Sequence, residues 1–235
     1  MAGEPVIRFG KSWPIFPLGA VVLFPHGVLP LHIFEERYRQ MVDDVLDTSG
    51  QIAMAVQAKS DFDDDDQWDA PPVRPVVCIG QIVRHQRLPD GRFYIWLQGL
   101  VRAKIARELP HEPGKLYREA ILEPLWKSPA TDEASLNPTR ERLSTMLTST
   151  PLNKLRDAKE VMKHIQNRDV PTSAILELMT LSFINDDDIR YKLLATGDPR
   201  GRARVIESEL ESIARLLRQA ESQMQNQPPK GCSWN

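Results

Sequence analysis

Residues 13–41 read WPIFPLGAVVLFPHGVLPLHIFEERYRQM, and the fold of the N-terminal half depends on this stretch. It holds two short apolar runs of β character, Val21–Phe24 and Leu29–Ile33, and we expect a strand from each. Proline fixes φ and has no amide donor, so the four prolines here argue against a long helix and against a central strand. The pattern then becomes helical, with Glu35 and Glu36 at the positive end of the expected helix. The stretch predicts short strands with sharp corners that lead into one helix.

More strands are expected after this helix, at Gln51–Ala58, Val76–Leu88, Arg92–Leu100 and Leu116–Pro124. The second and third flank Pro89-Asp90-Gly91, a turn in which proline presets φ and glycine accepts the left-handed conformation. On the strand after this turn, one face carries Phe93, Ile95 and Leu97, and the other carries Tyr94, Trp96 and Gln98. Both faces are apolar enough to be partly covered. Several short strands with one early helix predict a small, partly closed barrel.

A linker-like stretch begins at Trp126, and everything after it has a helical pattern. We expect helices to begin at Asn137, Asn153, Thr172 and Asp186, and a last, long helix to carry an apolar heptad seam from Ala203 to Met224. That seam packs either on the protein's own bundle or on a second copy, which would make a homo-oligomer. The predicted fold is α+β, with a β-rich domain over 1–125 and a helical bundle over 126–235 that ends in a disordered tail.

Composition and charge are those of an ordinary globular protein. Hydrophobic residues make up 41% and charged residues 26%, and the net charge of -2 gives no overall attraction to nucleic acid or an anionic membrane. No run approaches the roughly 18 apolar residues that span a bilayer, and the N-terminus lacks a signal-peptide pattern. Cys78 lies in an expected strand and Cys232 in the tail, so no disulfide is expected between them. We therefore expect a cytoplasmic protein that does not contact a membrane.

The motifs of common catalytic sites are missing from the sequence. It contains no G-x-x-x-x-G-K-[ST], G-x-S-x-G, HExxH or CxxC. An EF-hand loop begun at Asp61 in the acidic, proline-rich run would need Gly and Glu where Asp66 and Pro72 stand. His26 and His32 match no metal-ligand spacing. We expect no catalytic residue, metal site or cofactor, and we interpret the acidic run as a solvated loop.

Three blocks carry a family resemblance. The series PIFPLGAVVLFPHGVLPLHIFEERYRQMV (14–42) resembles the opening of the substrate-binding N-terminal domain of ATP-dependent Lon proteases, and of the stand-alone proteins that carry only that domain. IGQIVRHQRLPDGRFYIWLQGLVRAKI (79–105) resembles the family's hairpin, and RYKLLATGDPRGR (190–202) is similar to a helix junction near the end of the domain. The resemblance covers most of residues 13–217. It implies a bacterial protein with a PUA-like pseudo-barrel followed by a helical bundle.

The resemblance also implies a function. Full Lon enzymes owe their activity to an ATPase domain and a serine-lysine protease domain, and neither fits in this chain. We therefore expect a non-catalytic, chaperone-like module that binds unfolded or partly unfolded polypeptides, alone or with a protease or chaperone system. An apolar groove with charged edges suits such a ligand. The residues expected to bind it are Glu36, Arg37 and Tyr38 at the start of the first helix, and Trp68 in the acidic loop.

RNA binding is the alternative, because the family's pseudo-barrel is similar to RNA-binding PUA domains. Its patch would consist of basic residues interleaved with Tyr94 and Trp96, namely Arg84, Arg87, Arg92, Arg102, Lys104 and Arg107. The balanced net charge argues against it. Phe93, Tyr94 and Trp96 also fit core and interdomain packing. A third hypothesis, a small-molecule hydrolase that uses His26 or His32, lacks a nucleophile motif.

Overall fold

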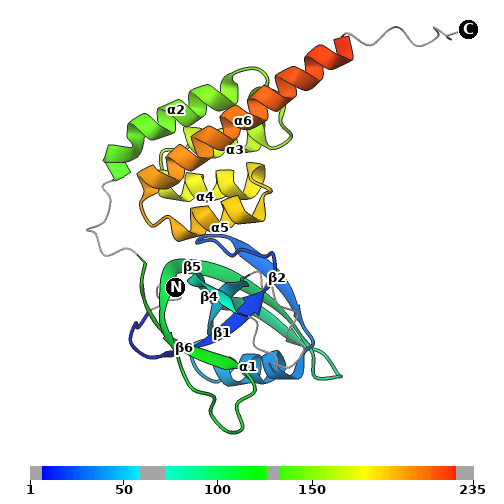
Figure 1. Ribbon diagram of the computed structural model, residues 1–235, viewed down its shortest axis with the longest axis vertical. Helices are drawn as coiled ribbons and strands as arrows, with labels where there is room; N and C mark the ends of the chain where they lie inside the picture. The colour runs from blue at the N-terminus through cyan, green and yellow to red at the C-terminus, as the bar shows by residue number, and fades with distance from the viewer. Residues whose placement is uncertain (1–6, 59–71, 126–132, 226–235) are drawn as a thin grey trace, which may run out of the picture. The chain divides into compact units, whose positions relative to one another are not determined.

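The structure is a computed structural model, and it describes residues 7–58, 72–125 and 133–225. The chain divides into two compact units (Figure 1). The first unit comprises Met1–Ala130 and Asn185–Asp198, and the second comprises Thr131–Ile184 and Pro199–Asn235. The predicted acidic loop with Trp68 and the predicted disordered tail lie outside the described residues.

Six strands of the first unit form one sheet in the order β2-β5-β4-β3-β1-β6, and a further pairing of β5 with β6 closes it. Their bounds are β1 Ser12–Leu18, β2 Val28–Ile33, β3 Gln51–Gln57, β4 Val73–Arg87, β5 Phe93–Glu108 and β6 Arg118–Pro124. The long strand β5 pairs with β2 through its first half and with β6 through its second half. Figure 1 shows the strands curving around a common interior. The predicted small barrel with one early helix, α1 (Glu36–Leu46), is confirmed.

The interior of the barrel is filled by small and branched side chains around one indole. The buried cluster draws on five strands and consists of Trp13, Ile15, Ala53, Ala55, Val77, Ile79, Ala103, Ala120 and Leu122. The β4–β5 turn has the predicted geometry, since Gly91 adopts a φ of 82° and the Leu88 amide donates to the Arg92 carbonyl at 2.8 Å. Local turn chemistry therefore sets the register of the longest hairpin.

The prediction for the prolines was wrong in two respects. β1 contains Pro14 and Pro17 and has strands on both sides, whereas Val21–Phe24 is not a strand. β1 pairs with β6 through its first half and with parallel β3 through its second half, so each half has only one paired side. A proline is tolerated where its missing N–H faces no partner strand. The run Val21–Phe24 is apolar because Val22, Leu23 and Phe24 are buried core residues.

The helix α5 (Asp187–Ala195) belongs to the first unit, although it follows α4 in the chain. The Tyr191 hydroxyl accepts a hydrogen bond from the Val76 amide at 2.9 Å, and the Arg102 guanidinium donates to the Leu194 carbonyl at 3.1 Å. Burial raises the pKa of Tyr191. The division made from the sequence placed this segment in the bundle. The described division differs because these contacts join α5 to β4 and β5.

The second unit is a bundle of α2 (Asn137–Thr148), α3 (Ala158–Gln166), α4 (Thr172–Phe183) and α6 (Pro199–Gln225), with short 3-10 turns at Glu133–Leu136 and Leu152–Lys154. The expected helix at Asn153 is one of these turns, and α3 begins later. Along the α6 seam Ala203, Ile206 and Leu210 are buried, Ile213 and Leu217 are partly exposed, and Met224 is 74% exposed. Packing on the bundle thus explains the first half of the seam, and contact with a second copy stays a prediction. Among the described helices, none is long and apolar enough to cross a membrane.

Candidate functional site

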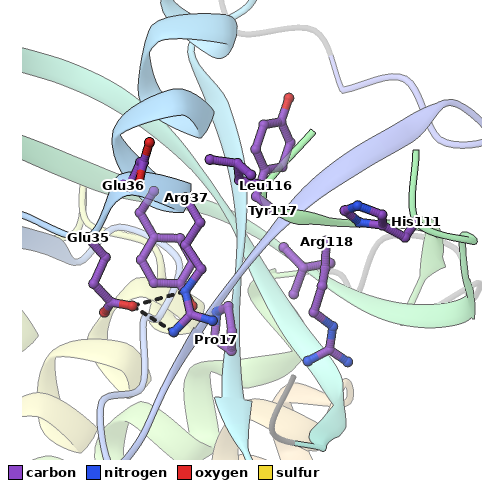
Figure 2. Close-up of a pocket in the computed structure, with 10 residues that line it drawn as sticks. Pro17, Glu35, Glu36, Arg37, His111, Leu116, Tyr117 and Arg118 are labelled. Atoms are coloured by element: carbon purple, nitrogen blue, oxygen red, sulfur yellow. Dashed lines mark hydrogen bonds and ion pairs between the residues drawn. The ribbon is translucent and has the colours of Figure 1, made fainter. Parts of the chain in front are cut away.

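A cavity of about 630 Å³ opens on the first unit where β1, the start of α1 and the segment that enters β6 meet (Figure 2). Three of the four predicted binding residues line it, namely Glu36, Arg37 and Tyr38. The fourth, Trp68, lies outside the described residues. The other lining residues are Ile15, Pro17, Glu35, His111, Leu116, Tyr117 and Arg118.

The floor of the cavity is apolar. Ile15 and Pro17 of β1 are buried, and the Tyr38 ring meets Phe16 edge to face with 4.6 Å between ring centres. Leu116 is 40% exposed and forms part of the mouth. The floor therefore offers apolar surface that a ligand side chain can cover.

Two arginines at the edge of the cavity already hold carboxylates. The Arg37 guanidinium donates to Glu35 at 2.9 and 2.6 Å, as the dashed lines in Figure 2 show, and its Cζ lies 5.0 Å from the centre of the Tyr38 ring. Arg118 binds Glu108 through contacts of 2.5 to 2.9 Å. These pairs fix the guanidinium groups in place before any ligand arrives.

One wall of the cavity is the segment between β5 and β6, which α1 holds by side-chain contacts. The Gln40 amide donates to the Gly114 carbonyl at 2.7 Å and accepts from the Leu116 amide at 2.6 Å. One helical turn further along the same face, Asp44 accepts from the Tyr117 hydroxyl at 2.9 Å. Burial, and then this hydrogen bond, raises the pKa of Tyr117. The same helix therefore supplies one side of the cavity and positions the other.

The sequence analysis did not identify the residues of this wall. His111, Leu116, Tyr117 and Arg118 come from the end of β5 to the start of β6, and only the expected strand at Leu116–Pro124 marked the region. Lys115 in this wall donates to Glu119 at 2.7 Å, which is the main cause of its raised pKa. No sequence signal places these residues beside α1, because the contact spans more than 70 positions.

Four of the six basic residues of the RNA alternative are already engaged by other groups of the protein. Arg102 is buried against α5, while Arg87 and Arg92 form ion pairs with carboxylates at 3.2 and 2.6 Å. Arg84 lies over the Trp96 ring at 4.7 Å. The aromatic residues divide, since Phe93 is core while Tyr94 is exposed and stacks on His32 at 4.8 Å.

The histidines named in the sequence analysis show no metal geometry in the described part of the chain. Residues 7–58, 72–125 and 133–225 contain no group of three or more His, Cys, Asp or Glu side chains placed to hold an ion. His26 is exposed at a corner with a φ of 66°, and His32 stacks on Tyr94.

Comparisons with known proteins point in one direction. The family described as ATP-dependent protease La (LON) substrate-binding domain matches residues 12–212. The Lon protease of Trichlorobacter lovleyi is 31% identical over 145 residues, which cover 61% of this chain and 17% of that protein. The Lon protease of Desulfovibrio desulfuricans is 28% identical over 199 residues, or 84% of this chain and 22% of that protein. The chain thus spans about a fifth of the length of these relatives.

Solved structures show the same fold. The N-terminal domain of a Mycobacterium avium complex Lon protease matches with a TM-score of 0.62 at 22% identity, over 86% of this chain and 98% of that one. A Lon N-terminal domain protein from Xanthomonas campestris matches with a TM-score of 0.60 at 22% identity, over 84% and 98%.

Proposed function

The chain belongs to the family of LON substrate-binding domains, and we propose that it binds unfolded or partly unfolded polypeptides through the cavity beside α1. In this proposal it is a recognition module without catalysis of its own, and it works alone or beside a protease or chaperone system. The observation that carries the proposal is the cavity itself, with an apolar floor and an edge of paired charges.

The chemistry of the cavity favours an unfolded chain as its ligand. Burying one large apolar side chain contributes about 1.5–3 kcal/mol, and folded proteins keep most such side chains inside. An unfolded chain presents them freely. The floor residues Ile15, Pro17 and Tyr38 offer apolar contact and no charged group. They therefore discriminate little between ligand sequences. One such contact is weak, and a long client raises its apparent affinity only because any of several segments can occupy the cavity.

The paired arginines place ordered charges at the edge of the cavity, but each pair is electrically balanced and produces only a weak electrostatic field. Arg37 and Arg118 are each held by a neighbouring carboxylate, so the edge carries ordered charges of both signs. Apolar burial is not screened by salt, whereas interactions between exposed charges are. Polypeptide binding at this site therefore persists at moderate salt.

The experiment is fluorescence anisotropy with a labelled, permanently unfolded polypeptide at low and at moderate salt. Leu116→Ser removes an apolar side chain from the cavity mouth, and we expect it to weaken binding about tenfold, which corresponds to about 1.4 kcal/mol. Leu181→Ser is the matched control, because Leu181 lies on α4 and is 42% exposed against 40% for Leu116. The control should bind as the unmodified protein does.

Labelled single-stranded RNA is the comparison ligand in the same titration. RNA binding depends on counterion release and falls steeply with salt. Saturable RNA binding that collapses in salt, together with silence toward the polypeptide, would overturn the proposal. Equal losses in Leu116→Ser and Leu181→Ser would separate polypeptide binding from the cavity.

A further inference from the structure

The charges around the cavity are unequal, and this inequality gives the proposed function a preference among polypeptides. The arginine and lysine side chains at the opening, Arg37, Arg118 and Lys115, each have a carboxylate partner. Arg37 pairs with Glu35 at 2.6 Å and Arg118 with Glu108 at 2.5 Å. Lys115 pairs with two carboxylates at once, Glu112 at 3.0 Å and Glu119 at 2.7 Å.

Glu36 is different. It lines the cavity, is exposed, and makes no ion pair with any residue that the structure describes (7–58, 72–125 and 133–225). Figure 2 shows its carboxylate pointing away from the Glu35–Arg37 pair. The start of α1 carries a partial positive charge of about one half, and because Arg37 balances Glu35, the full negative charge of Glu36 more than offsets it. The opening therefore keeps a net negative charge that is centred on Glu36.

We infer that the cavity prefers segments in which a large apolar residue has a lysine or arginine nearby, and that Glu36 selects for that cation. The inference rests on the proposed function, since the apolar residue must first enter the cavity. In an extended segment alternate side chains point the same way, and two residues span about 7 Å. The cation that reaches the same face thus lies two positions from the apolar residue.

The size of this preference follows from the exposure of Glu36. An ion pair near the surface contributes up to about 1 kcal/mol, and a carboxylate at the same place in the ligand is repelled instead. A lysine-containing segment should therefore bind about three- to tenfold more tightly than its glutamate counterpart. Because Glu36 is exposed, the ratio should shrink as salt rises.

The test is an NMR titration of the isotope-labelled full chain with short, unstructured peptides. Three peptides are identical except that Lys, Gln or Glu stands two positions after a single phenylalanine. The amide shifts of Tyr38 and Leu116 report occupation of the cavity. Glu36→Gln removes the charge, and Asp47→Asn is the matched control because Asp47 is an exposed acid at the other end of α1.

The inference is supported if affinity falls in the order Lys, Gln, Glu, if Glu36→Gln levels the three and if Asp47→Asn keeps the order. Equal affinity for all three peptides at the cavity overturns the inference and leaves the proposed function standing. A lysine preference that survives Glu36→Gln also overturns it, since another group then selects the cation. Peptides and unfolded polypeptide that both leave Tyr38 and Leu116 unmoved would overturn the proposed function as well.

Discussion

Replacement of Arg140 should destabilise the second unit far more than an identical replacement two residues away. Arg140 lies on α2, is buried, and its guanidinium donates to four carbonyls at and beyond the end of α3 at 2.5 to 3.2 Å. The acceptors are His164, Ile165, Asn167 and Val170. The last carbonyls of a helix have no partner within it and carry partial negative charge. A buried cation here therefore satisfies several groups at once.

The expected cost of Arg140→Met can be worked out bond by bond. The bond to Ile165 is buried, and leaving a buried acceptor without a donor costs about 1–3 kcal/mol. The other three lie where water can enter, and each loss costs about 0.5 kcal/mol. Together these losses amount to about 2.5–4.5 kcal/mol. Arg142→Met removes a half-exposed side chain whose ion pair is with Glu207 at 3.0 Å, and it should cost less than about 1 kcal/mol.

Urea unfolding followed by circular dichroism at the helical band gives the free energy of unfolding of each variant. Hydrogen exchange then shows whether protection is lost in α2 and α3, as the contacts require. The reasoning is refuted if Arg140→Met and Arg142→Met shift the unfolding free energy equally, or if protection in α3 is unchanged in Arg140→Met.

Two further predictions concern the barrel. Gly99→Ala would place a Cβ 2.1 Å from the Phe24 carbonyl oxygen, so we expect the free energy of unfolding in urea to fall by at least about 3 kcal/mol. In the control Gly19→Ala the nearest atom would be 3.9 Å from the new Cβ, and the free energy of unfolding should change by no more than about 0.5 kcal/mol. Equal stability of the two variants would contradict the packing at Gly99. The folded state raises the pKa of Tyr117 above its ordinary value of about 10, so its contribution to stability is fully present below about pH 10 and is lost as the pH rises further. Tyr117→Phe should reduce this loss of stability at alkaline pH, which is measured by unfolding curves from about pH 8 to about pH 11. An unchanged slope of the free energy of unfolding against pH would argue against a protonated Tyr117 in the folded protein.

Local chemistry made some elements predictable from the sequence. The turn at Pro89-Asp90-Gly91 and the helix that Pro171 introduces were expected and are present, because proline and glycine act within a few residues of themselves. β1 was missed for the opposite reason. Its partner strands β3 and β6 lie far along the chain, and its prolines lower the β propensity of the segment in the sequence. Apolar content alone did not separate this strand from the buried run Val21–Phe24.

The candidate site was half predictable on the same grounds. Glu36, Arg37 and Tyr38 are consecutive residues at a helix start, where a charged and aromatic pattern is visible in the sequence. The opposite wall depends on Gln40 meeting the segment before β6, a contact that spans 76 residues at Leu116. The sequence alone did not distinguish Glu36 from the other acids near it. Its lack of an ion-pair partner among the described residues depends on which side chains the fold brings together.

The prolines that obscured β1 also explain why a cavity exists beside it. Ile15 is the residue at which β1 changes partners, since it pairs with Arg118 of β6 on one side and with Ala53 of β3 on the other. Continued pairing with β6 would next require an amide donor near Pro17, and proline has none. β6 begins at Arg118, and the segment before it is held by α1 instead. Pro17 is therefore left as an apolar floor residue between a strand and a helix, so the feature that ends a strand pairing also supplies part of the floor that we propose as the polypeptide site.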